Sequence, residues 1–188
     1  FRLSQSVSWS APGPLLSRGR GPEEPPGRPT NQGPSPVQRT LSRPVTVSGH
    51  GLHTGAPARV TLRPAPSGAG IVLRRTDLPG RPAVPALWDR VLQSPLATRL
   101  VEGEASVSTI EHLMAALAGT GVHNALVEVD GPEVPILDGS AAPWVRALLS
   151  AGIARQDALL RAIRVLAPVE VATGDAAARL EPAPAPAM

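Results

Sequence analysis

Apolar residues recur at helical spacing between residues 108 and 118. Positions i, i+3, i+4, i+7 and i+8 of this stretch form one apolar face, made of Ile110, Leu113, Met114, Leu117 and Ala118. Ser108 followed three residues later by Glu111 is typical of a capping box at the start of a helix. Gly119 and Gly121 follow, and glycine commonly ends helices. The pattern predicts a helix over residues 108–118.

A second helix is predicted over residues 140–151. Pro143 lies in its first turn, where a missing N–H is tolerated, and Gly152 stands just after its end. The side that faces the core is predicted from its apolar residues, which are Trp144, Val145, Leu148 and Leu149.

Alternation of apolar and polar residues predicts several short strands. The first runs through Leu41, Val45 and Val47, and Pro44 restricts it to the edge of a sheet. Further strands are predicted at residues 58–63, 71–74, 84–92, 98–101, 105–107, 124–129 and 163–171. Strands followed by a helix, a strand and a second helix predict an α+β fold. We expect one mixed β-sheet with two helices packed on one face.

The composition changes near Thr40. Residues 1–39 are rich in Pro, Gly, Ser and Arg and have no apolar period. Because such a segment buries too little surface to offset the entropy of ordering, we expect it to be disordered. Residues 40–166 carry the predicted helices and most strands, and we expect them to form a folded domain.

The charge is divided in the same way. All 18 basic residues are Arg, and with 15 acidic residues they give a formal net charge of +3. Five Arg and two Glu lie within residues 1–39, so this segment holds the whole excess. The sequence shows no basic stripe with interleaved aromatic residues. Nucleic-acid binding is therefore not expected of the folded part, and a basic-tailed nucleic-acid-binding domain is kept as an alternative.

Cysteine is absent from the sequence, which excludes a disulfide scaffold and a thiolate metal site. No apolar run of about 18 residues is present, so no membrane-spanning helix is predicted. The first residues lack the apolar core of a signal peptide. We expect a soluble, cytoplasmic protein.

His112 lies opposite the apolar face of the first predicted helix. Its neighbours on that side are the small residues Ala115, Ala116 and Gly119. A solvated side would carry Lys, Glu or Gln, so we expect another domain or subunit to approach this side closely. The adjacent Glu111 has two compatible interpretations, as a member of the capping box and as an acid–base group.

The histidines do not form a complete metal site by their spacing. A catalytic zinc needs three protein ligands and an open position, and His112 supplies one. His50 and His53 lie three residues apart in a glycine-rich loop, which allows metal binding. The glycines equally indicate a turn in which both histidines are incidental. His123 follows a helix end, where a capping or solvent-facing role is expected.

Five motifs, in order, resemble one enzyme family. They are Gly-Leu-His-Thr-Gly at 51–55, Leu-Arg-Pro-Ala-Pro at 62–66, Arg-Arg-Thr-Asp-Leu at 74–78, Ser-Thr-Ile-Glu-His-Leu-Met-Ala-Ala-Leu-Ala-Gly at 108–119, and residues 128–143. Over about residues 40–182 the chain resembles the N-terminal domain of the UDP-3-O-acyl-N-acetylglucosamine deacetylases of lipid A biosynthesis. Each motif alone is of moderate specificity, whereas five in this order and spacing are highly specific.

The resemblance implies two similar α+β domains that pack through their helices around an active site. It implies that Glu111 is the general base and that His112 is a ligand of a catalytic Zn²⁺. Zinc and Glu111 would together activate the water that attacks the acetamide carbonyl. The implied substrate is UDP-3-O-acyl-N-acetylglucosamine, and the products are UDP-3-O-acyl-glucosamine and acetate. The loop with His53 and Thr54 would border the site.

Parts of the family pattern are missing from the chain. No His-x-x-x-Asp motif is present, although the family's other zinc ligands have that spacing, and the later His that protonates the leaving amine is absent. His50 stands where an aliphatic residue is expected. Residues 167–188 resemble the start of the second domain, so we expect an inactive fragment whose partner is the missing C-terminal domain. The alternative within the same fold is a non-catalytic partner-binding module.

Overall fold

The computed structural model describes residues 37–92, 94, 96–161 and 163–182. Disorder was expected for residues 1–39, and all of these except the last three lie outside the described residues. Those three belong to strand β1 (Val37–Leu41), so regular structure begins before Thr40. Pro44 lies between β1 and the next strand, β2 (Val45–His50), and the single first strand that was predicted is therefore two.

The main sheet has five strands in the order β2-β3-β9-β4-β5. The further strands are β3 (Pro57–Pro64), β9 (Ala125–Val129), β4 (Ile71–Arg75) and β5 (Ala83–Pro85). Strands β4 and β9 are parallel and the other pairs are antiparallel, so the sheet is mixed. In β3, Ala58, Val60 and Leu62 are buried while the residues between them face outward.

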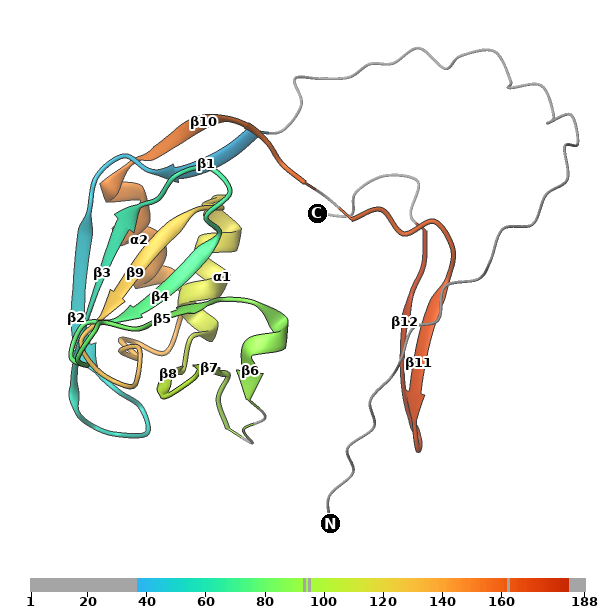
Figure 1. Ribbon diagram of the computed structural model, residues 1–188, viewed down its shortest axis with the longest axis horizontal. Coiled ribbons are helices and arrows are strands. Elements are labelled where there is room, and N and C mark those ends of the chain that lie inside the picture. Colours follow the sequence, from blue (N-terminus) through green and yellow to red (C-terminus); the bar gives the residue numbers. More distant parts are fainter. Residues whose placement is uncertain (1–36, 93, 95, 162, 183–188) are drawn as a thin grey trace, which may run out of the picture. The chain divides into compact units, whose positions relative to one another are not determined.

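Helices α1 (Glu111–Thr120) and α2 (Ala142–Ala151) cover one face of this sheet (Figure 1). Their fully buried side chains Leu113, Leu117, Trp144 and Leu148 share one hydrophobic core with the sheet residues. The predicted α+β fold with two helices on one face of a mixed sheet is confirmed.

The buried sides of the helices differ from the predicted apolar faces. In α1, Ala116 is buried and Ala118 is exposed, the reverse of the prediction. Because α1 contacts α2 as well as lying on the sheet, its buried arc is displaced toward Ala116. In α2, Leu149 is 60% exposed although it was predicted to face the core.

The capping box predicted for α1 does not form. Ser108 ends a strand, and the cap residue Ile110 makes no side-chain hydrogen bond to the helix. Thr109 between them has φ 60°, a left-handed conformation that turns the chain sharply into α1. At the other end Gly121, with φ 70°, closes the helix as expected.

A second, three-stranded sheet contains β6 (Val91–Leu92), β7 (Arg99–Glu102) and β8 (Ala105–Ser108). The strand predicted over residues 84–92 is wrong, because this stretch is split into β5, the short 3-10 helix η1 (Trp88–Arg90) and β6. Pro85 has no N–H for a further ladder bond, and β5 ends there.

Two antiparallel pairs complete the described chain. Strand β10 (Ile153–Leu159) pairs with β1 and was missed, since polar residues interrupt its apolar pattern. Strands β11 (Val169–Thr173) and β12 (Ala176–Leu180) form a hairpin, whereas residues 163–168 of the predicted stretch belong to no strand. Across the described residues, the helices are all too short or too polar to cross a membrane.

Candidate active site

Glu111 and His112 are the first two residues of α1. The Glu111 side chain is exposed, and its carboxylate accepts a hydrogen bond from the backbone N–H of Thr98, just before β7. Burial raises the pKa of this carboxyl, but hydrogen bonds from Thr98 and from the backbone of Glu111 bring the pKa below its ordinary value. Glu111 is therefore a carboxylate at neutral pH and is able to accept a proton.

The predicted loop residues His53 and Thr54 are held by a different carboxylate, that of Glu133. Glu133 is only 2% exposed. Its Oε1 accepts from the His53 N–H at 3.0 Å and from the Thr109 hydroxyl at 2.9 Å. Its Oε2 accepts from the Thr54 N–H at 2.9 Å and from the Thr54 hydroxyl at 2.8 Å. Four donors therefore surround one buried side chain.

These hydrogen bonds decide the charge of Glu133. Burial alone raises the pKa of a carboxyl, but the donors on His53, Thr54 and Thr109 lower the pKa of Glu133 to about 2. The loop wraps so closely that a Cβ on Gly51 would lie 2.2 Å from Oε2 of Glu133. Glycine at 51 is thus required for close approach to an ionised side chain.

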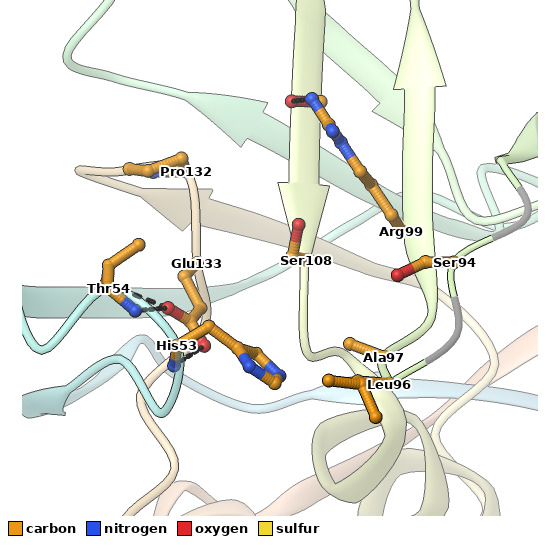
Figure 2. A pocket seen from close by; sticks show the side chains of 10 residues that line it. His53, Thr54, Ser94, Leu96, Ala97, Arg99, Ser108, Pro132 and Glu133 are labelled. Carbon is orange, nitrogen blue, oxygen red and sulfur yellow. Dashed lines mark hydrogen bonds between the residues drawn. The ribbon is translucent and has the colours of Figure 1, made fainter.

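His53, Thr54 and Glu133 line a cleft of about 370 Å³, whose other walls are Ser94, Leu96, Ala97, Arg99, Ser106, Ser108 and Pro132. In Figure 2 the His53 imidazole extends into the cleft toward Leu96 and Ala97. Glu111 lines a second hollow of about 420 Å³, together with Thr98 and the apolar residues of β6. Both hollows share Ser94, Leu96 and Ala97, so one loop borders both groups of predicted site residues.

The histidines have separate environments. His112 is half-buried and lines neither hollow, while His50 is exposed at the end of β2. The Nδ1 atom of His123 accepts a hydrogen bond from the Arg39 N–H at 3.0 Å, which links the turn after α1 to strand β1. Burial and the nearby Arg39 charge lower the pKa of His123. His123 therefore bonds to a strand N–H and does not cap a helix, which differs from the capping or solvent-facing role that was expected.

The sequence interpretation did not single out Glu133, Thr109 or Thr98. Glu133 lies in a turn-rich loop, where a carboxylate is expected to face solvent, and the left-handed backbone of Thr109 has no sequence signal. The only available signal was that Thr109 lies within the motif at 108–119 and Glu133 within the motif at 128–143.

The family model LpxC, described as UDP-3-O-acyl N-acetylglycosamine deacetylase, matches residues 38–188. The chain belongs to this family. The UDP-3-O-acyl-N-acetylglucosamine deacetylase of Myxococcus xanthus is 51% identical over 146 residues, which cover 78% of this chain and 46% of that protein. Deacetylases of the same name from Shewanella loihica and Cellvibrio japonicus are 49% and 48% identical, each covering 77% of this chain and 48% of the relative.

The resemblance drawn from the five motifs is thus confirmed. The family match contains all four predicted site residues, Glu111, His112, His53 and Thr54. The chain spans about half the length of the curated relatives it matches.

The zinc ion that the resemblance implies needs three protein ligands at a catalytic site. Within the part of the chain that the structure describes, no group of three or more His, Cys, Asp or Glu residues could hold a metal ion. The described residues therefore do not form a complete catalytic zinc site by themselves.

Proposed function

We propose that this chain takes part in the hydrolysis of the N-acetyl group of UDP-3-O-acyl-N-acetylglucosamine. The products are UDP-3-O-acyl-glucosamine and acetate, as the names of the relatives and the lipid A pathway suggest. The observation that carries the proposal is the ionised Glu111 at the start of α1, open to a hollow, in a chain of this family.

Glu111 is assigned the role of general base. Its carboxylate would take a proton from the water that attacks the acetamide carbonyl. The lowered pKa of Glu111 supports this role because the base is then deprotonated at neutral pH. Its hydrogen bond to the Thr98 N–H holds one carboxylate oxygen in place at the start of α1.

His112 is assigned to Zn²⁺, which in such enzymes lowers the pKa of a bound water. The described residues do not bring both a second and a third ligand to His112. The remaining ligands are expected from the part of the family's length that this chain does not cover.

His53 and Thr54 are proposed to border the bound substrate. The cleft that they line adjoins the hollow of Glu111 through Ser94, Leu96 and Ala97. A substrate lying over this shared wall would contact the loop at one end and the general base at the other.

The second domain of the same protein is the proposed partner. Ala115, Ala118 and Gly119 are exposed small residues on α1, and such a surface permits close packing of another helix. We propose that residues 40–166 form the first domain, that residues 167–188 begin the second, and that the protein is cytoplasmic. If so, the amides of β11 and β12 should exchange rapidly in this chain and slowly in the complete gene product.

The test uses the complete gene product, meaning this chain with any sequence that follows it. Release of acetate from the UDP-sugar and zinc content are measured together. Glu111→Ala should retain zinc and lose at least about a hundredfold in turnover, the scale of general-base catalysis. His112→Ala should lose both zinc and turnover.

The control is Glu104→Gln, an exposed carboxylate in the β7–β8 turn, which should change neither readout. Full turnover in Glu111→Ala would refute the assignment of the base. A complete protein without zinc or activity would instead favour the partner-binding module.

A further inference from the structure

Glu133 is a buried carboxylate that is satisfied entirely by hydrogen bonds. It takes part in none of the ion pairs formed by the described residues. All four of its donors come from two segments, the loop 51–55 and Thr109. A side chain placed only to fill space would be apolar, because a buried charge is costly unless every acceptor is paired.

The backbone around Glu133 joins the same two segments. The Ser108 N–H donates to the Pro132 carbonyl at 2.9 Å, and the Val134 N–H donates to the Ser108 carbonyl at 3.1 Å. Residues 132–134 therefore form a bridge to the end of β8, directly before the turn into α1. From this bridge the Glu133 side chain reaches across to the loop that carries His53 and Thr54 (Figure 2).

A continuous series of hydrogen bonds leads from Glu133 to Glu111. The Thr109 hydroxyl donates to Glu133, and the Thr109 N–H donates to the Thr98 carbonyl at 3.1 Å. The Thr98 N–H in turn donates to the Glu111 carboxylate. Thr109 also has the left-handed φ of 60°, a conformation that persists only where surrounding contacts hold it.

We propose that Glu133 is a positioning residue of the candidate active site. Its carboxylate ties the loop 51–55 to Thr109 and thereby sets the separation between His53 and Glu111 across the adjoining hollows. The consequence for turnover depends on the proposed deacetylase function, whereas the anchoring of the loop does not. The two parts are therefore tested separately.

The anchoring is tested by amide hydrogen exchange in the 188-residue chain. Glu133→Gln keeps the shape of the side chain but offers one acceptor oxygen and turns an NH₂ group toward N–H and O–H donors. The amides of His53 and Thr54 should lose protection by about tenfold or more, while those of Val60 and Val127 in the central strands stay protected. Glu104→Gln is the matched control and should change none of these amides.

Retained protection at His53 and Thr54 in Glu133→Gln would overturn the anchoring. If that variant does not fold, Thr109→Val and Thr109→Ser decide the matter. The valine removes one donor to Glu133 with little change of shape, and the serine restores the hydroxyl. Loss of loop protection in the valine variant alone supports the proposal, and equal protection in both variants contradicts it.

The consequence for turnover is tested by a double-mutant cycle in the complete gene product. If Glu133 acts by placing His53, then Glu133→Gln should add little, less than about threefold in kcat/KM, to the loss already caused by His53→Ala. Zinc content should be unchanged. If Glu133 only supports stability, the two losses should multiply.

The outcomes separate the two proposals. An inactive wild-type gene product refutes the deacetylase function and leaves the exchange experiment to decide the anchoring. An active wild type with multiplying losses, or with unchanged kcat/KM in Glu133→Gln or His53→Ala, overturns the positioning role.

Discussion

The two sides of helix α1 differ in how far the described residues cover them. On the inner side, Leu113 and Leu117 are fully buried against the core. Just before the helix, Thr109 donates to the buried Glu133, which accepts from four donors in all. On the outer side, Glu111, Ala115 and Gly119 are exposed, and the adjacent His112 is only half-buried. The inner side serves the fold, and the outer side presents the candidate site residues Glu111 and His112.

The largest difference is expected between Leu113 and His112. Leu113→Ala removes a fully buried side chain and should lower the free energy of unfolding by about 2–5 kcal/mol. His112→Ala should cost less than about 1 kcal/mol in this chain, because its side chain is partly exposed and lies outside the hydrophobic core. Urea denaturation followed by tryptophan fluorescence measures both. Equal midpoints for the two variants would contradict the orientation of α1.

Acid should distinguish Glu133 from Glu111. The pKa of Glu133 is lowered from 4.5 to about 2, so its contribution to stability is present above pH 4.5. It is lost as the pH falls toward 2, and by linkage it amounts to at most about 3 kcal/mol. Glu133→Gln should therefore flatten the decline of stability between pH 5 and 2, as measured by urea midpoints. Glu111→Gln should leave that decline nearly unchanged, because the Glu111 side chain is exposed.

Gly51 and Gly119 allow a steric comparison of a closely packed position with an exposed one. At Gly51 an added Cβ would lie 2.2 Å from Glu133 and 2.3 Å from the Thr54 hydroxyl oxygen, whereas at Gly119 it would meet nothing within 4 Å. Gly51→Ala should destabilise the chain by about 1–3 kcal/mol through overpacking. Gly119→Ala should be neutral or stabilise it by up to about 1 kcal/mol, since alanine favours the helix. Thermal unfolding of both variants checks this, and a stable Gly51→Ala would show that the loop is not closely fitted.

The smallest effect on stability is expected when zinc is added to the 188-residue chain. His112 alone offers one ligand, so the 188-residue chain should contain no zinc after dialysis against a weak chelator. Excess zinc should then leave its midpoint of thermal unfolding unchanged, since only a ligand that binds the folded state raises it. Stoichiometric zinc that His50→Ala or His53→Ala removes would show a complete site within this chain.

The helices and central strands were predictable because their residues follow local periodicities. Leu113 and Leu117 recur at helical spacing, and Val60 and Leu62 alternate at strand spacing. The prediction failed at Ala116, Ala118 and Leu149, where the burial of a residue depends on the neighbouring element and not on the helix itself. It failed again in the strand predicted over residues 84–92, where Pro85 ends β5 and residues 88–90 form a short 3-10 helix.

The candidate site shows the same division. Glu111, His112, His53 and Thr54 could be proposed as site residues from the sequence, because five ordered motifs sufficed to indicate the family. The α+β fold that the local patterns predict is consistent with this family. These properties are carried by residues close together in the sequence, and no contact needs to be known to see them.

Only the tertiary structure showed how Glu133 is held. Its four donors come from residues 24 to 80 positions away in the sequence, and the left-handed turn at Thr109 replaces the capping box that local rules predicted. A sequence does not distinguish a buried glutamate from a solvated glutamate. Their pKa values and roles diverge only when folding brings distant donors to one of them. The sequence thus determined the family, the fold class and the candidate residues, and the folded chain decided how those residues are held.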